Sequence, residues 1–106
     1  MQDIRIDTTP NCPSLVIDGL RVLPILYGLS DFPAARSNTA QAKRNIVHFN
    51  KAGIGLVSAD TCLHLGWHKV SPFETEAMRE EIAGVLDANP NARVLLRLHA
   101  NPPYWW

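Results

Sequence analysis

The chain has 106 residues, of which 46% are hydrophobic and 19% charged, and its ten basic and ten acidic side chains give a formal net charge of zero. This composition excludes a disordered tail, and the neutral balance disfavours nucleic-acid binding, which usually needs a basic surface. No apolar run is long enough to span a bilayer, so neither nucleic acid nor a membrane is an expected partner.

The first seven residues alternate charged and apolar side chains and lack the apolar core of a signal peptide. If Met1 is the native start, this pattern predicts a cytoplasmic protein. Cys12 and Cys62 are too few and too far apart for a disulfide framework, so we expect two reduced thiols.

Residues 1–22 predict an N-terminal β unit. Ile4 to Ile6 has strand character, and two further β-rich runs, 15–17 and 20–22, flank the dipeptide Asp18-Gly19. Asp-Gly between such runs favours a tight β-hairpin turn. Pro24 lacks the N–H that a strand ladder needs. We therefore expect the hairpin to end near this proline and a second unit to cover residues 23–106.

Residues 23–106 alternate between strand and helix patterns. Thr39 is a predicted N-cap and Gly53 a predicted C′ glycine of the first helix, which we expect over 39–52. Ser71, Pro72 and Glu74 together predict a capping box that starts the second helix. The three expected strands cover 23–27, 54–59 and 94–99, and residues 60–70 are expected to form a loop.

A β-α-β-α-β order is typical of parallel sheets, whose crossovers are right-handed. Two architectures remain, a doubly wound sheet and a (β/α)8 barrel. The dinucleotide-binding version of the former needs a glycine-rich turn after the first strand, and residues 27–31 contain a single glycine. The predicted fold class is therefore α/β, an N-terminal β-hairpin followed by the first part of an incomplete TIM barrel.

Each predicted strand becomes polar towards its C-terminal end. Alternation along the third strand places Arg97, His99 and Asn101 on one face, while the same reasoning selects Asp60 after the second strand and Tyr27 in the first. Because barrel enzymes keep their chemistry at this end, we expect these five side chains to face a common mouth.

Aromatic residues gather in the segments that follow the second and third strands. His64 and Trp67 lie in the first of these, and Trp105 and Trp106 follow a rigid Pro-Pro pair in the second. Flat rings at a barrel mouth can stack on a ligand face, although tryptophans after a strand fill the space beneath a loop about as often. Both interpretations stay open. Since the chain stops here, we expect it to be the opening part of a larger domain.

Cys62, His64 and His68 invite comparison with a metal site, because the two histidines are four residues apart. Gly66 interrupts the helical turn that this spacing would need, and a fourth ligand would have to come from elsewhere. No metal and no other cofactor is therefore expected.

Five parts of the chain carry a resemblance to a known family: the N-terminal hairpin and the segments Val22–Gly28, Phe49–Val57, Leu63–Trp67 and Asn101–Trp106. They resemble the start of many retaining glycoside hydrolase barrels, and most closely the β-galactosidase-like enzymes of glycoside hydrolase family 42. In that family the acid/base glutamate follows the fourth strand and the nucleophile glutamate the seventh, so the resemblance places both beyond Trp106. It implies a carbohydrate substrate, with the rest of the barrel as the second partner.

The acidic residues of the chain also indicate that this segment alone does not hydrolyse glycosides. Glycoside hydrolysis needs two carboxylates facing one sugar, and Asp60 is the one acid expected at the mouth. No catalytic residue is therefore assigned. The expected substrate-binding residues are Tyr27, Asp60, His64, Trp67, Arg97, His99, Asn101, Trp105 and Trp106.

A second function class stays open beside the hydrolase. The chain can equally be a small, non-catalytic α/β module that binds carbohydrate or another partner. The coding sequence downstream of Trp106 would distinguish the hydrolase from the non-catalytic module, because glutamates at the ends of later strands are expected only in the hydrolase.

Overall fold

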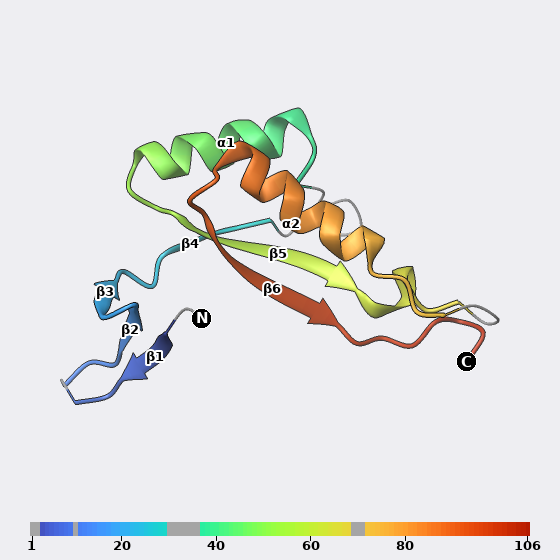
Figure 1. The fold of residues 1–106 in the computed structure, drawn as a ribbon, viewed down its shortest axis with the longest axis horizontal. Coiled ribbons are helices and arrows are strands. Elements are labelled where there is room, and N and C mark those ends of the chain that lie inside the picture. The colour runs from blue at the N-terminus through green and yellow to red at the C-terminus, as the bar shows by residue number, and fades with distance from the viewer. Residues whose placement is uncertain (1–2, 10, 30–36, 69–71) are drawn as a thin grey trace.

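The computed structural model describes residues 3–9, 11–29, 37–68 and 72–106, which form a mixed α/β arrangement of two sheets and two helices (Figure 1). The boundary between the sheets falls between Val22 and Leu26. In chain order the elements are β1 (Ile4–Asp7), β2 (Ser14–Ile17), β3 (Leu20–Val22), β4 (Leu26–Gly28), α1 (Ala40–Lys51), β5 (Leu56–Cys62), a short 3₁₀ helix η1 (Leu63–Leu65), α2 (Glu76–Ala88) and β6 (Arg93–His99).

The first sheet is antiparallel, in the order β1-β2-β3. Ile17 and Leu20 face each other across the predicted turn. Asp18 and Gly19 have φ angles of 50° and 79°, and a type I′ turn requires positive φ at both central positions. Glycine adopts such angles without steric cost and aspartate tolerates them better than most residues, so the predicted hairpin is confirmed.

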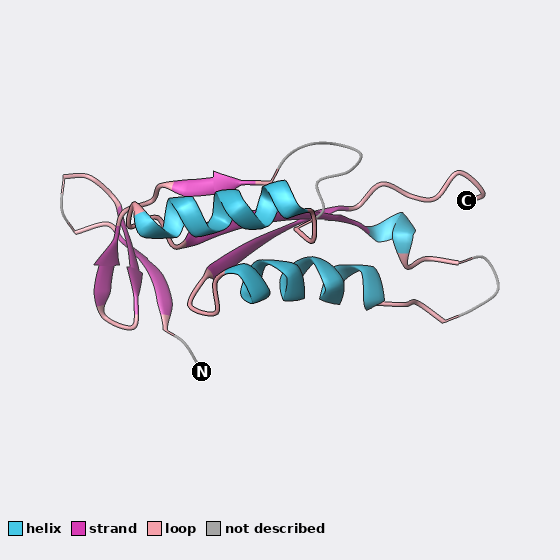
Figure 2. Ribbon diagram, turned by 90° about the horizontal axis from the view of Figure 1, so that it is seen from above, coloured by secondary structure: helices cyan, strands magenta, loops and turns pink. Residues whose placement is uncertain are grey.

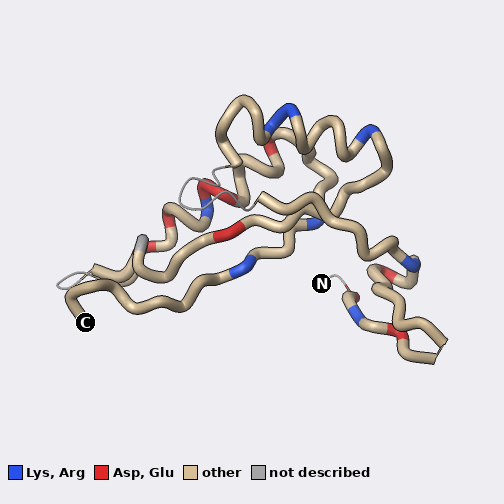
Figure 3. Tube along the Cα trace, turned by 180° about the vertical axis from the view of Figure 1, so that it is seen from behind, with Lys and Arg blue, Asp and Glu red and all other residues tan. Residues whose placement is uncertain are grey.

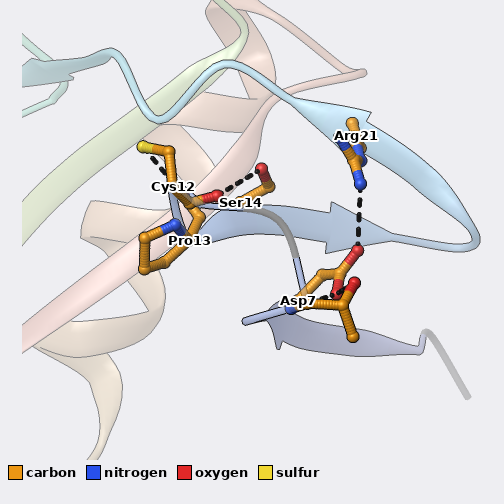
Figure 4. A network of polar contacts seen from close by, with 6 residues as sticks. Asp7, Cys12, Pro13, Ser14 and Arg21 are labelled. Carbon is orange, nitrogen blue, oxygen red and sulfur yellow. Dashed lines mark hydrogen bonds and ion pairs between the residues drawn. The ribbon is translucent and has the colours of Figure 1, made fainter.

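A polar network centred on Asp7 links the two outer strands of this sheet (Figure 4). The Asp7 Oδ1 atom accepts hydrogen bonds from the Thr9 hydroxyl at 2.7 Å and the Thr9 backbone N–H at 3.1 Å, while Arg21 Nη2 donates to Oδ2 at 3.2 Å. The bonds from Thr9, and secondarily the Arg21 charge, hold the pKa of Asp7 below its ordinary value of 3.8.

This lowered pKa makes the stability of the chain depend on pH. A carboxyl whose pKa falls on folding stabilises the fold above its unfolded-state pKa, and the effect disappears as the pH falls through the folded-state value. We expect Asp7→Asn to reduce the loss of Tm on acidification through pH 3.8, as followed by circular dichroism. Thr9→Val, which removes the hydroxyl donor, should have a similar effect. An acid transition unchanged in both variants would contradict this assignment.

The second sheet is parallel, in the order β4-β5-β6, and both helices lie on the same face of it (Figures 1 and 2). β5 and β6 pair along their whole length, from Leu56 opposite Arg93 to Cys62 opposite His99. β5 therefore continues three residues beyond the predicted end at residue 59. The expectation of a loop from Asp60 is wrong because β6 supplies a ladder partner as far as Cys62.

The core lies between the parallel sheet and the two helices. Ile46 of α1, Val57 of β5 and Val85 of α2 are at most 1% exposed, and Leu29, Ala42 and Ala59 complete the buried cluster. Val94 and Leu96 pack against it from β6, as strand alternation predicts. None of the described helices is long and apolar enough to cross a membrane.

The predicted limits of α1 are confirmed. The Thr39 side chain accepts a hydrogen bond from Ala42 N at 3.2 Å, which caps the first turn. Gly53 has a φ of 84°, the left-handed conformation expected just after a helix.

The predicted start of α2 is wrong. The helix begins at Glu76, with Thr75 as an N-cap that makes no side-chain bond, and Ser71 lies outside the described residues. The Glu74 N–H donates to the Gly66 carbonyl at 2.9 Å. Residues 72–75 therefore run beside the η1 turn instead of continuing the helix, and Glu74 does not complete a capping box.

Candidate functional site

Asp60, Arg97 and His99 meet on the face of the parallel sheet that the helices leave uncovered. The strand register places Asp60 opposite Arg97. Arg97 Nη2 donates to Asp60 Oδ2 at 2.9 Å, and Arg97 Nε lies 2.7 Å from Oδ1. His99 Nε2 lies 3.5 Å from the same Oδ1 atom. The one hydrogen bond, from Nη2 to Oδ2, and the charge attraction hold the carboxylate against the guanidinium, while the buried Oδ1 atom accepts no hydrogen bond among the described residues.

The three side chains differ in their access to solvent. Asp60 is 19% exposed, whereas Arg97 and His99 are 47% and 43% exposed. Most charged positions lie on the helices and the first sheet, and few lie on the parallel strands (Figure 3). The partly buried carboxylate and its two exposed nitrogen-bearing neighbours can accept from and donate to a polar ligand. We refer to them as the Asp60 cluster.

A groove of about 870 Å³ lies at the carboxyl end of the same strands. Trp67 and Trp105 meet edge to face with ring centroids 5.9 Å apart, and the Trp106 ring lies 5.8 Å from Trp67. We call this hollow the aromatic groove. Its lining residues are His64, Trp67, His68, Asn101, Pro102, Pro103, Tyr104 and Trp105.

Two backbone turns hold the walls of the aromatic groove. Pro103 is buried, and its carbonyl accepts from Trp106 N at 3.1 Å. On the opposite wall a Cβ atom at Gly66 would overlap the Glu74 carbonyl, so this close backbone approach requires glycine. The groove is therefore shaped by chain geometry as well as by its rings.

Most of the predicted binding residues fall into these two groups. The Asp60 cluster contains three of them, and His64, Trp67, Asn101 and Trp105 line the aromatic groove. Trp106 contacts Trp67 but is 79% exposed and does not line the groove. Of the two terminal tryptophans, Trp105 is therefore the one that packs inward.

Tyr27 belongs neither to the Asp60 cluster nor to the aromatic groove, and the predicted orientation of its side chain is wrong. It pairs with Val57, which places its side chain on the helix-covered face. Its hydroxyl accepts a hydrogen bond from Asn45 Nδ2 at 3.0 Å, and its ring stacks on Phe49 with centroids 4.6 Å apart. Both partners belong to α1. Side chains do alternate along β4 as expected. However, β4 pairs with β5 one residue away from the expected register, which moves the Tyr27 side chain to the other face of the sheet.

Four residues that line the aromatic groove are not among those predicted from the sequence: His68, Pro102, Pro103 and Tyr104. His68 was considered only as a metal ligand, and the structure pairs its Nε2 with Glu74 Oε2 at 3.3 Å. Across the residues that the structure describes, no three His, Cys, Asp or Glu side chains are close enough to hold a metal ion. The Pro102-Pro103 pair predicts a rigid loop but does not predict which residues of that loop line the aromatic groove. Cys12 and Cys62 are both free thiols.

Comparisons of the chain with protein-family models, with curated proteins and with solved structures gave no match.

Proposed function

We propose that this chain is the N-terminal segment of a glycoside hydrolase barrel of the β-galactosidase type, where it forms part of the wall of the sugar site. The observation that carries the proposal is the position of the Asp60 cluster and the aromatic groove at the carboxyl end of one parallel sheet. Barrel enzymes place substrate-binding residues at that end.

The winding of the sheet supports the proposal. The strands β4, β5 and β6 lie side by side in the sheet in the same order as along the chain, and both helices cover one face of this sheet (Figure 2). A (β/α)8 barrel repeats this arrangement, with the helices outside and the opposite face turned inward. The uncovered face carries Asp60 and Arg97, so in a barrel this ion pair would point into the interior.

The chemistry of the two groups fits a sugar. Arg97 presents N–H donors and Asp60 an acceptor, which matches hydroxyl groups that both donate and accept. Trp67 and Trp105 offer aromatic surface for the C–H face of a pyranose ring. Catalysis needs a second carboxylate facing the first, and Asp60 is the one carboxylate on this face of β5 and β6 among the described residues. In this proposal the catalytic glutamates belong to later strands, and the chain alone does not hydrolyse glycosides.

The direct test is sugar binding by the chain itself. All three tryptophans lie at the aromatic groove or in contact with its rings, so tryptophan fluorescence, excited selectively over tyrosine, reports on this region alone. We expect galactose or lactose to change the emission in a saturable way. Asn101→Ala should weaken binding by about 1–3 kcal/mol because it removes a polar contact, while Tm stays unchanged. Asn50→Ala, an exposed position on α1, serves as the matched control.

Two further outcomes separate the alternatives. Absence of any saturable change with either sugar would contradict the sugar site. Turnover of an aryl galactoside by the chain alone, abolished by Asp60→Asn, would contradict the assignment of catalysis to other strands. The non-catalytic module is the second candidate, and the tryptophan rings that meet at the aromatic groove without a contribution from another chain favour it. Binding that persists without hydrolysis when the natural downstream sequence is added would support it.

A further inference from the structure

The Asp60 cluster and the aromatic groove are successive parts of the same two chain segments. Asp60 belongs to the cluster, and His64 lines the groove four residues later. On the neighbouring segment His99 belongs to the cluster, and Asn101 lines the groove two residues later. Since an extended chain rises about 3.3 Å per residue, the step from His99 to Asn101 covers at most roughly 7 Å. The two groups are therefore close enough for one extended ligand to reach both.

The aromatic groove is also larger than a single sugar ring needs. Its volume of about 870 Å³ lies near the upper end of the range for sites that enclose drug-sized ligands, about 300–1,000 Å³. A single pyranose is smaller than such a ligand, and the Asp60 cluster is not part of the groove lining. Together the two groups offer room for at least two linked rings.

The cluster and the groove differ in their chemistry. The buried Asp60 Oδ1 atom accepts no hydrogen bond among the described residues, and Arg97 and His99 beside it are half-exposed donors. Such a set matches a ring with many free hydroxyl groups. Trp67 and Trp105 present aromatic surface instead, which matches the C–H face of a ring. A terminal sugar has more free hydroxyl groups than a unit substituted through a glycosidic bond, so the terminal unit suits the cluster and the next unit suits the groove.

We propose that the ligand is an oligosaccharide of at least two units, with its terminal galactosyl ring at the Asp60 cluster and the adjoining ring in the aromatic groove. The inference rests on the proposed sugar site and adds the length and the orientation of the substrate. The linkage between the two units then lies at the boundary between the cluster and the groove. Galactosides with a small alkyl group in place of the second ring leave the groove empty and bind more weakly.

Methyl β-galactoside and lactose isolate the contribution of the second ring. Both carry a β-linked galactosyl ring, and only lactose adds another ring. In NMR titrations of the ¹⁵N-labelled chain, lactose should bind roughly tenfold more tightly, the gain expected when one more ring stacks on an aromatic face. Both ligands should shift the amide signals of Arg97 and His99. Only lactose should shift the indole N–H signals of Trp67 and Trp105.

Variants assign the two rings to the two groups. Trp105→Ala should bring the ratio of the two affinities close to one, because it removes aromatic surface from the groove. Arg97→Met should weaken both ligands by a similar factor and so preserve the ratio. Asn50→Ala, on the exposed side of α1, should change neither affinity. If Trp105→Ala fails to fold by circular dichroism, Trp105→Phe keeps a smaller ring and should lower the ratio in part.

Three results would overturn the proposal while the sugar site itself stands. The first is equal affinity of the wild-type chain for the two ligands. The second is a shift of the indole signals by methyl β-galactoside as large as that by lactose, because the galactosyl ring would then occupy the groove. The third is an affinity ratio that Trp105→Ala leaves intact. Binding of neither ligand would overturn the proposed function together with this inference.

Discussion

Replacing Ile46 by alanine is expected to lower the free energy of unfolding by about 2–5 kcal/mol, the range for large-to-small changes in a close-packed core. Ile46 is completely buried at the centre of the cluster that joins α1 to the parallel sheet. A domain of this size has a total stability of only about 5–15 kcal/mol, so the variant should be close to unfolding. Urea denaturation followed by circular dichroism measures the change.

The matched control is Ile6→Ala. Ile6 is 59% exposed on β1, so the same deletion of methylene groups removes little buried surface there. We expect a loss below about 1 kcal/mol, as for most surface substitutions. Similar losses at the two positions would mean that Ile46 does not hold the core together.

Gly84→Ala is expected to destabilise the chain by about 1–3 kcal/mol, as overpacking does in a tight core. In an isolated helix the same change stabilises by about 1 kcal/mol, so the predicted sign is reversed. Gly84 is buried in α2, where a Cβ atom would lie 2.8 Å from Asn38 Oδ1 and 3.0 Å from Ser37 Cβ.

Ser37 cannot easily move away from such a Cβ atom. It is fully buried, its hydroxyl donates to the Glu81 carbonyl at 2.7 Å, and its N–H donates to Glu81 Oε2 at 2.9 Å. Thermal unfolding of Gly84→Ala checks the prediction. Ala83→Gly, at the neighbouring exposed position, should cost about 1 kcal/mol through helix propensity alone. A higher Tm for Gly84→Ala would show that the contact between residue 37 and α2 is loose.

The Lys43–Asp87 ion pair joins the two helices at their solvent-facing side, and its hydrogen bond and charge lower the pKa of Asp87. The Asp87 side chain is 68% exposed and the Lys43 side chain 34%, and solvent-accessible pairs of this kind contribute little to stability. The helices are therefore held together mainly by Ile46, Val85 and the Ser37 contacts.

Elements with a purely local cause could be predicted from the amino-acid sequence. The turn at Asp18-Gly19 follows from the backbone angles that these two residues tolerate. Thr39 and Gly53 supply the cap and the left-handed residue that bound α1, and neither depends on distant contacts. Alternation along β6 also placed Arg97 and His99 on one face correctly, because the period of a strand is a property of the backbone.

How these elements meet depends on contacts between residues that are distant in the sequence. β5 extends to Cys62 because β6 supplies its ladder, and α2 starts late because Glu74 N bonds to Gly66. The register of β4 on β5 turned Tyr27 towards α1, and the register of β6 brought Arg97 to Asp60. A strand's own residues fix which side chains share a face, but its neighbours fix the register and therefore which face meets which partner.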